Sequence, residues 1–374
     1  MADKSAIEWT DATWNPVVGC SIVSPGCTHC YAMSMAARIE AMTAALQAKG
    51  QTGAPHYVGT TKKVNGHTVW TGKLALAPDH ILTEPLAWRT PRRIFVNSMG
   101  DLFHEDVPDA WIDKVFAIMA LAPQHTFQVL TKRAKRMREY FEKIDQELRS
   151  AGEQGYAPRR LDQLACDISR SPRAADTDWP LPGVPDWPLP NVWLGVSAER
   201  QREADERVPE LLATPAAIRF VSAEPLLGPI NIIDAMWAGQ DPASSHLEET
   251  IDWIIVGGES GPDARPMHPA WARSIRDQCH RVSAPFFFKQ WGAWADSSDA
   301  PDLVEGREDL IFAPDGKVLG AGGRLGRKMQ GSVEPDWRAL GGAWMTLTGK
   351  KAAGRLLDGV EHNAMPELRE VSAL

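Results

Sequence analysis

The sequence is poor in cysteine and contains no long apolar run. Only five of its 374 residues are cysteine, and three of these fall within eleven consecutive positions, which excludes a disulfide framework. No stretch approaches the roughly 20 apolar residues of a membrane span, and the first ten residues lack an apolar run of signal-peptide length. We therefore expect a soluble cytoplasmic protein with no membrane partner, whose thiols a reducing environment keeps available for metal.

An excess of basic charge is also missing, because 48 acidic residues outnumber 40 basic ones and the formal charge is -8 at pH 7. Nonspecific coating of nucleic acid needs a broad basic surface that displaces counterions, so this mode of binding is excluded. A local basic site for a nucleotide or nucleic acid is not excluded. Hydrophobic residues make up 44% of the chain and charged residues 24%, which is typical of a globular protein with a sizeable core.

The clustered thiols occupy a loop that contains the turn Pro25-Gly26. They belong to Cys20, Cys27 and Cys30, with six residues between the first two and two between the last two. A structural zinc ion normally takes four protein ligands, whereas an iron–sulfur cubane held by three cysteines leaves one iron open to a chelating small molecule. The spacing therefore favours a cluster. A zinc site with His29 or a distant histidine as fourth ligand, and three unliganded thiols, are the alternatives.

Short apolar runs rich in Val, Ile, Phe and Trp recur at helix-sized intervals, with amphipathic stretches between several of them. Such runs are typical of strands buried on both faces of a parallel sheet. They cover residues 93–97, 126–130, 192–196, 218–221, 253–256 and 286–289, after a first short strand expected just before Cys20. The alternation predicts a partial parallel (β/α) barrel, in which a helix over residues 32–49 follows the cysteine loop.

Candidate functional residues follow these runs, because the site of such a barrel lies at the carboxyl ends of its strands. The acid–base candidates are Glu199, Glu224 and His104. The candidates for cofactor contacts are Asn97, Ser98, Asp101, Ser197, Ser222, Gly258 and Glu259. The candidates for substrate contacts are Lys132, Arg133 and Lys289, and the first two, which begin a basic run at a strand end, suit a substrate phosphate. Helix capping is the alternative role for the Ser and Glu residues, two pairs of which recur in a repeated Val-Ser-Ala-Glu sequence.

The chain divides by composition into two parts. Residues 1–294 carry the barrel runs, with an insertion at about 150–190 in which Asp-Trp-Pro-Leu-Pro occurs twice, at 178–182 and 186–190. Prolines in these repeats forbid helix and central strand, so an extended lid or surface excursion is expected. Residues 295–374 are polar and Gly-rich at first, and we expect them to form a segment that closes the open side of the barrel.

The segment Trp9-Thr10-Asp11-Ala12-Thr13-Trp14-Asn15-Pro16, followed by the three cysteines and Tyr31-Ala32, resembles a phage-associated three-Cys-motif family of unknown function, itself similar to radical S-adenosylmethionine (SAM) enzymes. Matching blocks span nearly the whole chain, at residues 95–104, 129–133, 193–197, 220–226, 257–261 and 287–292. The usual radical SAM spacing differs, with three residues rather than six between the first two cysteines.

This resemblance implies a [4Fe-4S] cluster on the three cysteines, SAM bound to the open iron, and hydrogen abstraction from a substrate. It also implies a reductant protein and a separately encoded three-Cys-motif partner protein. A DNA base or nucleotide is the first substrate expected, by similarity to spore photoproduct lyase. Two other classes stay open: a zinc-stabilised nucleic-acid-binding protein, and a metal-free barrel hydrolase that uses the acid–base candidates.

Overall fold

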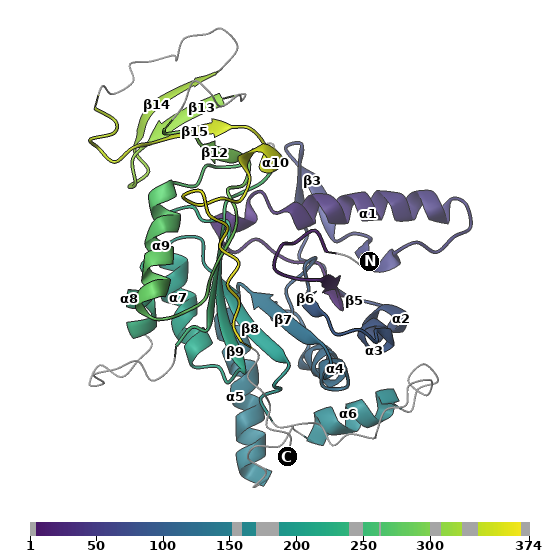
Figure 1. The fold of residues 1–374 in the computed structure, drawn as a ribbon. Helices are drawn as coiled ribbons and strands as arrows, with labels where there is room; N and C mark the ends of the chain where they lie inside the picture. The colour runs from purple at the N-terminus through teal and green to yellow at the C-terminus, as the bar shows by residue number, and fades with distance from the viewer. Residues whose placement is uncertain are drawn as a thin grey trace.

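The core of the protein is a seven-stranded, wholly parallel sheet that curls into a half-barrel (Figure 1). The computed structural model describes residues 5–151, 159–169, 187–238, 250–261, 263–299, 308–323 and 336–367. The strands, in spatial order, are β1 (Ala12–Trp14), β6 (Arg93–Val96), β7 (Thr126–Thr131), β8 (Val192–Ser197), β9 (Ile218–Ala223), β10 (Trp253–Gly257) and β11 (Phe286–Gln290). The expected partial parallel barrel is thus confirmed in outline, and the last six strands begin at the predicted residues.

The first strand differs from the prediction. The segment just before Cys20 is β2 (Val17–Val18), which pairs antiparallel with β5 (Ala75–Leu76) in a separate two-stranded sheet. The barrel strand is β1, which pairs with β6. Pro16 lies between β1 and β2 and has no N–H to donate, so the chain leaves the sheet there.

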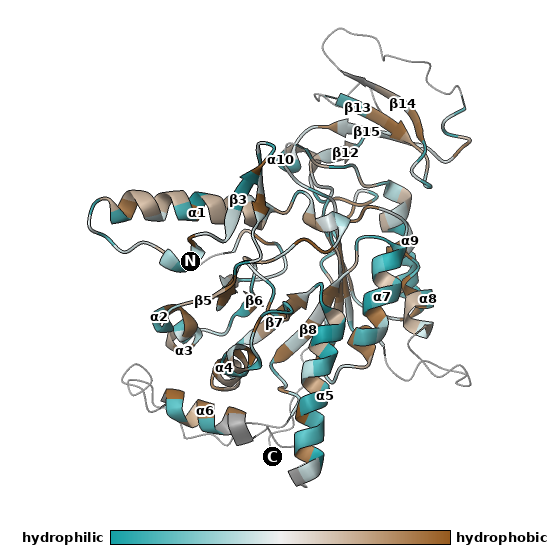
Figure 2. Ribbon diagram, turned by 180° about the vertical axis from the view of Figure 1, so that it is seen from behind, coloured by the Kyte–Doolittle hydropathy of each residue, from teal (hydrophilic) through white to brown (hydrophobic). Residues whose placement is uncertain are grey.

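Helices cover the convex face of the sheet. They are α4 (Asp109–Ala120), α5 (Ala134–Ala151), α7 (Gln201–Leu212), α8 (Ile232–Trp237) and α9 (Pro269–Arg281). Alternate strand residues such as Ile94, Val129 and Ile254 point outward into a large apolar core shared with these helices. Figure 2 shows the same division, with hydrophobic strands and hydrophilic outer helix faces. In the described ranges, no helix is both long and apolar enough to cross a membrane.

The predicted insertion is described only in part. Helix α6 (Arg159–Ser169) lies within it, and the second Trp-Pro repeat is seen from Trp187 onward. The first repeat, at residues 178–182, lies outside the described residues, and so does the expectation that it forms a lid.

Aromatic residues fill the part of the concave face that lies below the carboxyl ends of the strands. Trp193, Phe220, Trp253 and Phe287 point inward from four successive strands. Distant parts of the chain cover them: Trp9 precedes β1, and a segment near the C-terminus lies across the same face. In that segment the carbonyl of Ala364 accepts a bond from the Trp253 indole at 2.9 Å, and Met365 packs on the cluster. These residues form an apolar floor below the carboxyl ends of the strands.

The N-terminal helix stands apart from the outer helices. The chain after the cysteine loop forms α1 (Tyr31–Gln47), close to the predicted 32–49, and continues through the hairpin β3 (Thr61–Val64) and β4 (His67–Trp70). Met33 and Ala36 pack α1 against Trp70 of this hairpin. The short helices α2 (Asp79–Leu82) and α3 (Glu84–Ala87) then lead to β6.

A four-stranded antiparallel sheet follows the barrel. Its strands are β12 (Trp294–Asp296), β15 (Ala343–Leu347), β13 (Glu308–Phe312) and β14 (Val318–Gly323), in that spatial order. After α10 (Lys350–Ala353) the chain returns to the barrel, and in Figure 1 this yellow segment runs down along the sheet. The Phe288 N–H donates to the carbonyl of His362 at 2.9 Å, which joins the returning segment to β11.

Candidate functional site

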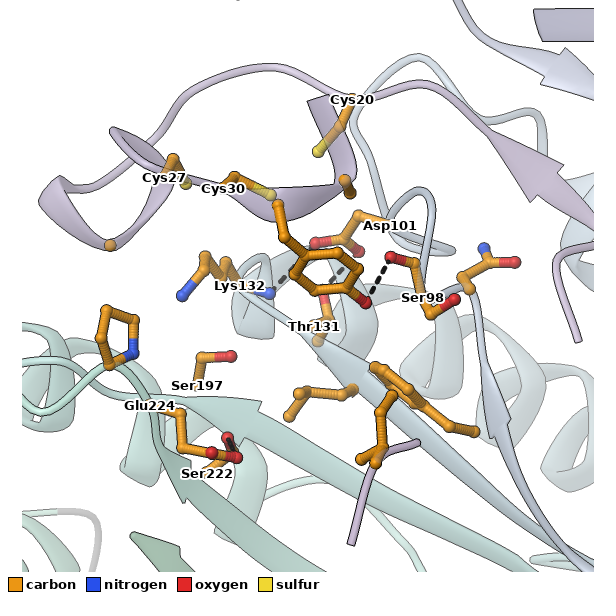
Figure 3. A pocket seen from close by; sticks show the side chains of 18 of the residues that line it. Cys20, Cys27, Cys30, Ser98, Asp101, Thr131, Lys132, Ser197, Ser222 and Glu224 are labelled. Atoms are coloured by element: carbon orange, nitrogen blue, oxygen red, sulfur yellow. Dashed lines mark hydrogen bonds between the residues drawn. The ribbon is translucent and has the colours of Figure 1, made fainter. Parts of the chain in front are cut away.

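A cavity of about 260 Å³ lies at the carboxyl ends of the strands, between the sheet and the cysteine loop. Its volume approaches the ~300–1,000 Å³ of small-molecule sites. Figure 3 shows the cysteine side chains above it and strand-end side chains below. The predicted residues that line it are Cys20, Cys27, Cys30, Asn97, Ser98, Asp101, Lys132, Arg133, Ser197, Ser222, Glu224, Gly258, Glu259 and Lys289. The sequence therefore located the wall of the cavity, and only Glu199 and His104 of the predicted set lie behind it.

The cysteine loop turns through the 3-10 helix at Pro25–Cys27 and ends at Cys30, the N-cap residue directly before α1. The backbone N–H groups of Ala32 and Met33 at this helix N-terminus lower the pKa of the Cys30 thiol and partly offset the effect of burial. Burial raises the pKa of Cys20 to about 12 and also raises the pKa of Cys30. The metal-free thiols of Cys20 and Cys30 are therefore protonated at neutral pH, and metal binding has to release their protons.

One buried ion pair holds the first part of this loop. Arg133 donates to the Ser21 hydroxyl at 2.7 Å and to its carbonyl at 3.2 Å, and its Nη1 lies 3.4 Å from the Cys20 sulfur. Asp101 accepts from Arg133 at 3.0 Å and from the Thr131 hydroxyl at 2.6 Å. Two backbone N–H groups, of Phe103 and Lys132, complete its bonds. Asp101, predicted as a cofactor contact, lies in the cavity wall, and the bonds of its carboxylate go to Arg133, Thr131 and the backbone.

Glu199 holds the middle of the loop from complete burial. It accepts bonds from the Ser24 hydroxyl at 2.8 Å and from Arg207 at 3.1 Å, and it pairs with Lys132. Burial alone would raise the pKa of Glu199, but Lys132 and Arg207 outweigh burial, and the pKa lies below its ordinary value. A Cβ on Gly26 would lie 2.3 Å from a Glu199 oxygen, so only glycine lets the loop approach this closely.

A third anchor comes from the end of β10. Glu259 binds Arg265 through both carboxylate oxygens, at 2.5 and 2.8 Å, and the same guanidinium donates to the carbonyl of Pro25 at 2.9 Å. His29 lies 3.1 Å from Glu259. Arg265 was not predicted, because it lies on an irregular segment between β10 and α9 and no sequence motif marks it.

His104 supports the same loop rather than facing the cavity. Its Nδ1 accepts the Asp106 N–H at 3.2 Å, so its Nε2 carries the proton and donates to the Ser21 hydroxyl at 2.8 Å. Burial lowers the pKa of His104, which keeps the ring neutral.

The other glutamate of the repeated sequence faces the cavity. Glu224 follows β9, accepts a bond from the Ser222 hydroxyl at 3.1 Å, and lies 3.0 Å from the ammonium of Lys289. Gly257 leaves room for it, since a Cβ there would lie 2.4 Å from a Glu224 oxygen. Figure 3 shows Glu224, Ser222 and Ser197 reaching toward the cavity from neighbouring strands.

Two polar side chains of the cavity wall are incompletely bonded. Asn97 accepts the Val17 N–H through Oδ1 at 3.2 Å, and its buried Nδ2 has no partner among the described residues. Gln290 donates through Nε2 to the Gly258 carbonyl at 3.3 Å, and its buried Oε1 has no partner in the same part of the chain. These backbone bonds fix both amide orientations and leave one donor of Asn97 and one acceptor of Gln290 without a partner, but both atoms are buried rather than exposed to the cavity.

Aromatic rings complete the wall, and the sequence did not single them out as site residues. The Tyr31 hydroxyl donates to the carbonyl of Ser98 at 3.0 Å, which fixes its ring at the cavity. Trp9, Trp70 and Phe95 also line the cavity. Tyr31 directly follows Cys30, the last cysteine of the loop, and this position could have marked it as a site residue.

Within the residues that the structure describes, no three His, Cys, Asp or Glu side chains form a group placed to hold a metal ion. The three cysteines are free thiols in the structure, with Cys27 buried and the other two half-buried. All three cysteines line one cavity. That they also converge to bind one cluster stays a prediction.

Comparison with known families gives one result. Residues 4–366 match the model of a family described as "Protein of unknown function (DUF5131)", and because the match covers nearly the whole chain, the protein belongs to that family. Searches of curated proteins and of solved structures found no match. The family description names no activity, so the function has to be argued from the site.

Proposed function

We propose that this member of a family of unknown function is a radical SAM-type enzyme, in which Cys20, Cys27 and Cys30 hold a [4Fe-4S] cluster. One observation carries the proposal: all three cysteines of the loop after β1 line a single cavity at the carboxyl ends of a parallel half-barrel. That end is where barrels of this kind carry their active sites.

The donor set fits such a cluster. Three thiols and no fourth cysteine lie at the cavity wall, the number that leaves one iron open. The N-terminus of α1 and the guanidinium of Arg133 supply positive charge beside two of the sulfurs, which suits an anionic cluster with its thiolates. When bound, the cluster would supply an electron for cleavage of SAM, and the resulting radical would remove hydrogen from the substrate.

The protein's own residues would hold and shield this centre. Arg133, Glu199 and Arg265 fix the loop at three points, at Ser21, Ser24 and Pro25 respectively. A loop fixed in this way keeps its geometry while the centre changes charge. The aromatic floor below excludes water from one side of the cavity, which protects a reactive intermediate.

Polar groups at the strand ends would bind the cofactor. The hydroxyls of Ser197 and Ser222 line the cavity and suit ribose oxygens. Ser98 is committed elsewhere, because its hydroxyl donates to Asn15 at 3.1 Å and its carbonyl accepts from Tyr31. Gly258 would allow a ligand to approach the backbone closely.

The test is anaerobic reconstitution with iron and sulfide, followed by electron paramagnetic resonance of the reduced protein with and without SAM. We expect a [4Fe-4S] signal that shifts when SAM is added. A variant with Cys20, Cys27 and Cys30 all changed to Ala should lose the signal, whereas Cys166→Ala, which alters a thiol on α6, should keep it.

The same experiment separates the alternatives. A colourless protein that binds one zinc would support the zinc-stabilised nucleic-acid-binding protein instead. A triple cysteine variant with full activity would support the metal-free hydrolase, although Glu199 would then have to act while bound to Ser24, Lys132 and Arg207. Either result would overturn the radical SAM proposal.

A further inference from the structure

The charged side chains that line the cavity balance one another. They are three carboxylates and three cations, namely Asp101, Glu224, Glu259, Lys132, Arg133 and Lys289. Each of the cations is paired: Lys132 with Glu199, Arg133 with Asp101, and Lys289 with Glu224. A phosphate inside the cavity would therefore meet as much negative charge as positive charge. This argues against the phosphate contacts that the sequence predicted for the substrate. An anionic cluster on the cysteines would add negative charge, so the substrate group that enters beside it should be uncharged.

The pair of Glu224 and Lys289 is the most accessible of the three. Their side chains are 14% and 18% exposed, whereas those of Asp101 and Arg133 are 7% and 4% exposed. Among the described residues, Glu224 and Lys289 bond to Ser222 and to each other rather than to the cysteine loop, which is held by the buried pairs. The open pair presents a hydrogen-bond acceptor and a donor side by side to whatever enters the cavity.

We propose that Glu224 and Lys289 bind the hydrogen-bonding edge of an uncharged nucleobase in which two adjacent N–H donors lie beside a carbonyl oxygen, as in guanine. The two carboxylate oxygens of Glu224 would accept from these N–H groups, and Lys289 would donate to the carbonyl oxygen. This inference rests on the proposed function, since it names the substrate of that site. The sugar and phosphates would stay outside, as they do when an enzyme takes a base out of its stack.

One further feature favours a planar ring over another ligand with donors and an acceptor, such as an amino-acid zwitterion. The cavity wall carries Trp9, Tyr31, Trp70 and Phe95, and aromatic rings of this kind stack on bases. Thymine, adenine and cytosine each offer the pair one donor beside one acceptor, whereas guanine offers two adjacent donors and one acceptor, so guanine should bind most tightly.

The test is isothermal titration of the reconstituted full chain, with SAM present, by deoxyguanosine, thymidine, deoxyadenosine, deoxycytidine and deoxyguanosine 5′-monophosphate. We expect deoxyguanosine to bind roughly 10- to 100-fold more tightly than the other three nucleosides, because only its base can use both oxygens of Glu224. The 5′-phosphate should change the affinity by less than about threefold, because it stays outside the neutral cavity. Glu224→Gln should remove the preference, and Lys135→Gln, on the exposed side of α5, should retain it.

Unfolding of each variant is followed in parallel, and Glu224→Asp, which keeps the charge but withdraws the carboxylate, serves as a second variant that should also weaken binding. Equal affinity for all four bases would overturn the inference, as would a large gain from the 5′-phosphate that Lys289→Gln abolishes. Loss of base binding on addition of SAM would also overturn it, because the pair would then belong to the cofactor. A base preference without an iron–sulfur signal would contradict the proposed function and leave this inference standing. A SAM-responsive signal without a base preference would support the proposed function and contradict this inference.

Discussion

The sequence Val-Ser-Ala-Glu occurs at the ends of two neighbouring strands, and its two glutamates have different environments. Glu199 after β8 is fully buried, and its bonds go to Ser24, Lys132 and Arg207. Glu224 after β9 is partly open, and its bonds go to Ser222 and Lys289 at the cavity. A glycine faces each carboxylate, Gly26 in the first case and Gly257 in the second.

The difference teaches that the strand ends serve two purposes. One set of carboxylates holds the cysteine loop in place, and the other is available to a ligand. Local sequence cannot separate the two sets, because the deciding partners are remote: Ser24 lies 175 residues from Glu199. Burial and partner identity, rather than residue type, thus decide which glutamate is structural.

The largest loss of unfolding free energy should come from neutralising Glu199, the buried glutamate. Glu199→Gln leaves Arg207 and Lys132 without their carboxylate, and breaking a buried ion pair costs about 3–5 kcal/mol. Glu224→Gln should cost less, about 1–2 kcal/mol, because its site is partly open. Urea unfolding monitored by circular dichroism measures both. Equal losses in the two variants would remove the distinction drawn between the two glutamates.

Replacing Gly26 and Gly257, the glycines that face the two glutamates, should cause an intermediate loss of stability. In Gly26→Ala the new methyl would meet Glu199 at 2.3, 2.5 and 2.7 Å, and that side chain is held by three partners. We expect a loss of about 1–3 kcal/mol and a lower cluster content. In Gly257→Ala the close contact is with the end of Glu224, which can swing into the cavity, so stability should change less and base binding more. Thermal unfolding and iron analysis of both variants check this contrast.

The smallest effect is a difference in acid sensitivity. The pKa of Glu199 is depressed in the folded protein, so its contribution is complete above the unfolded value of about 4.3 and is lost as the pH falls through the folded pKa. The gap in unfolding free energy between wild type and Glu199→Gln should therefore narrow as the pH falls from 7 toward 3. A gap that stays constant over this range would show that the carboxylate charge is not what stabilises the loop.

Much of the fold was predictable because its barrel strands are short apolar runs, and these runs gave the first residue of six strands correctly. The cavity wall was predictable for a related reason, since parallel strands bring their carboxyl ends together. The antiparallel sheet from β12 to β15 was not, because its sequence is polar and Gly-rich. Arg265 was missed as well. It acts through a backbone carbonyl of the cysteine loop 240 residues away, and no local pattern records such a contact.

The apolar floor has a consequence for how the protein is made. Trp9 precedes the first barrel strand, whereas Ala364 and Met365, which lie on the same cluster, follow the last one. Contacts between residues so distant in the sequence form late and slow folding. The half-barrel must therefore exist for a time with its concave face uncovered, and its inward aromatic side chains are then exposed to solvent.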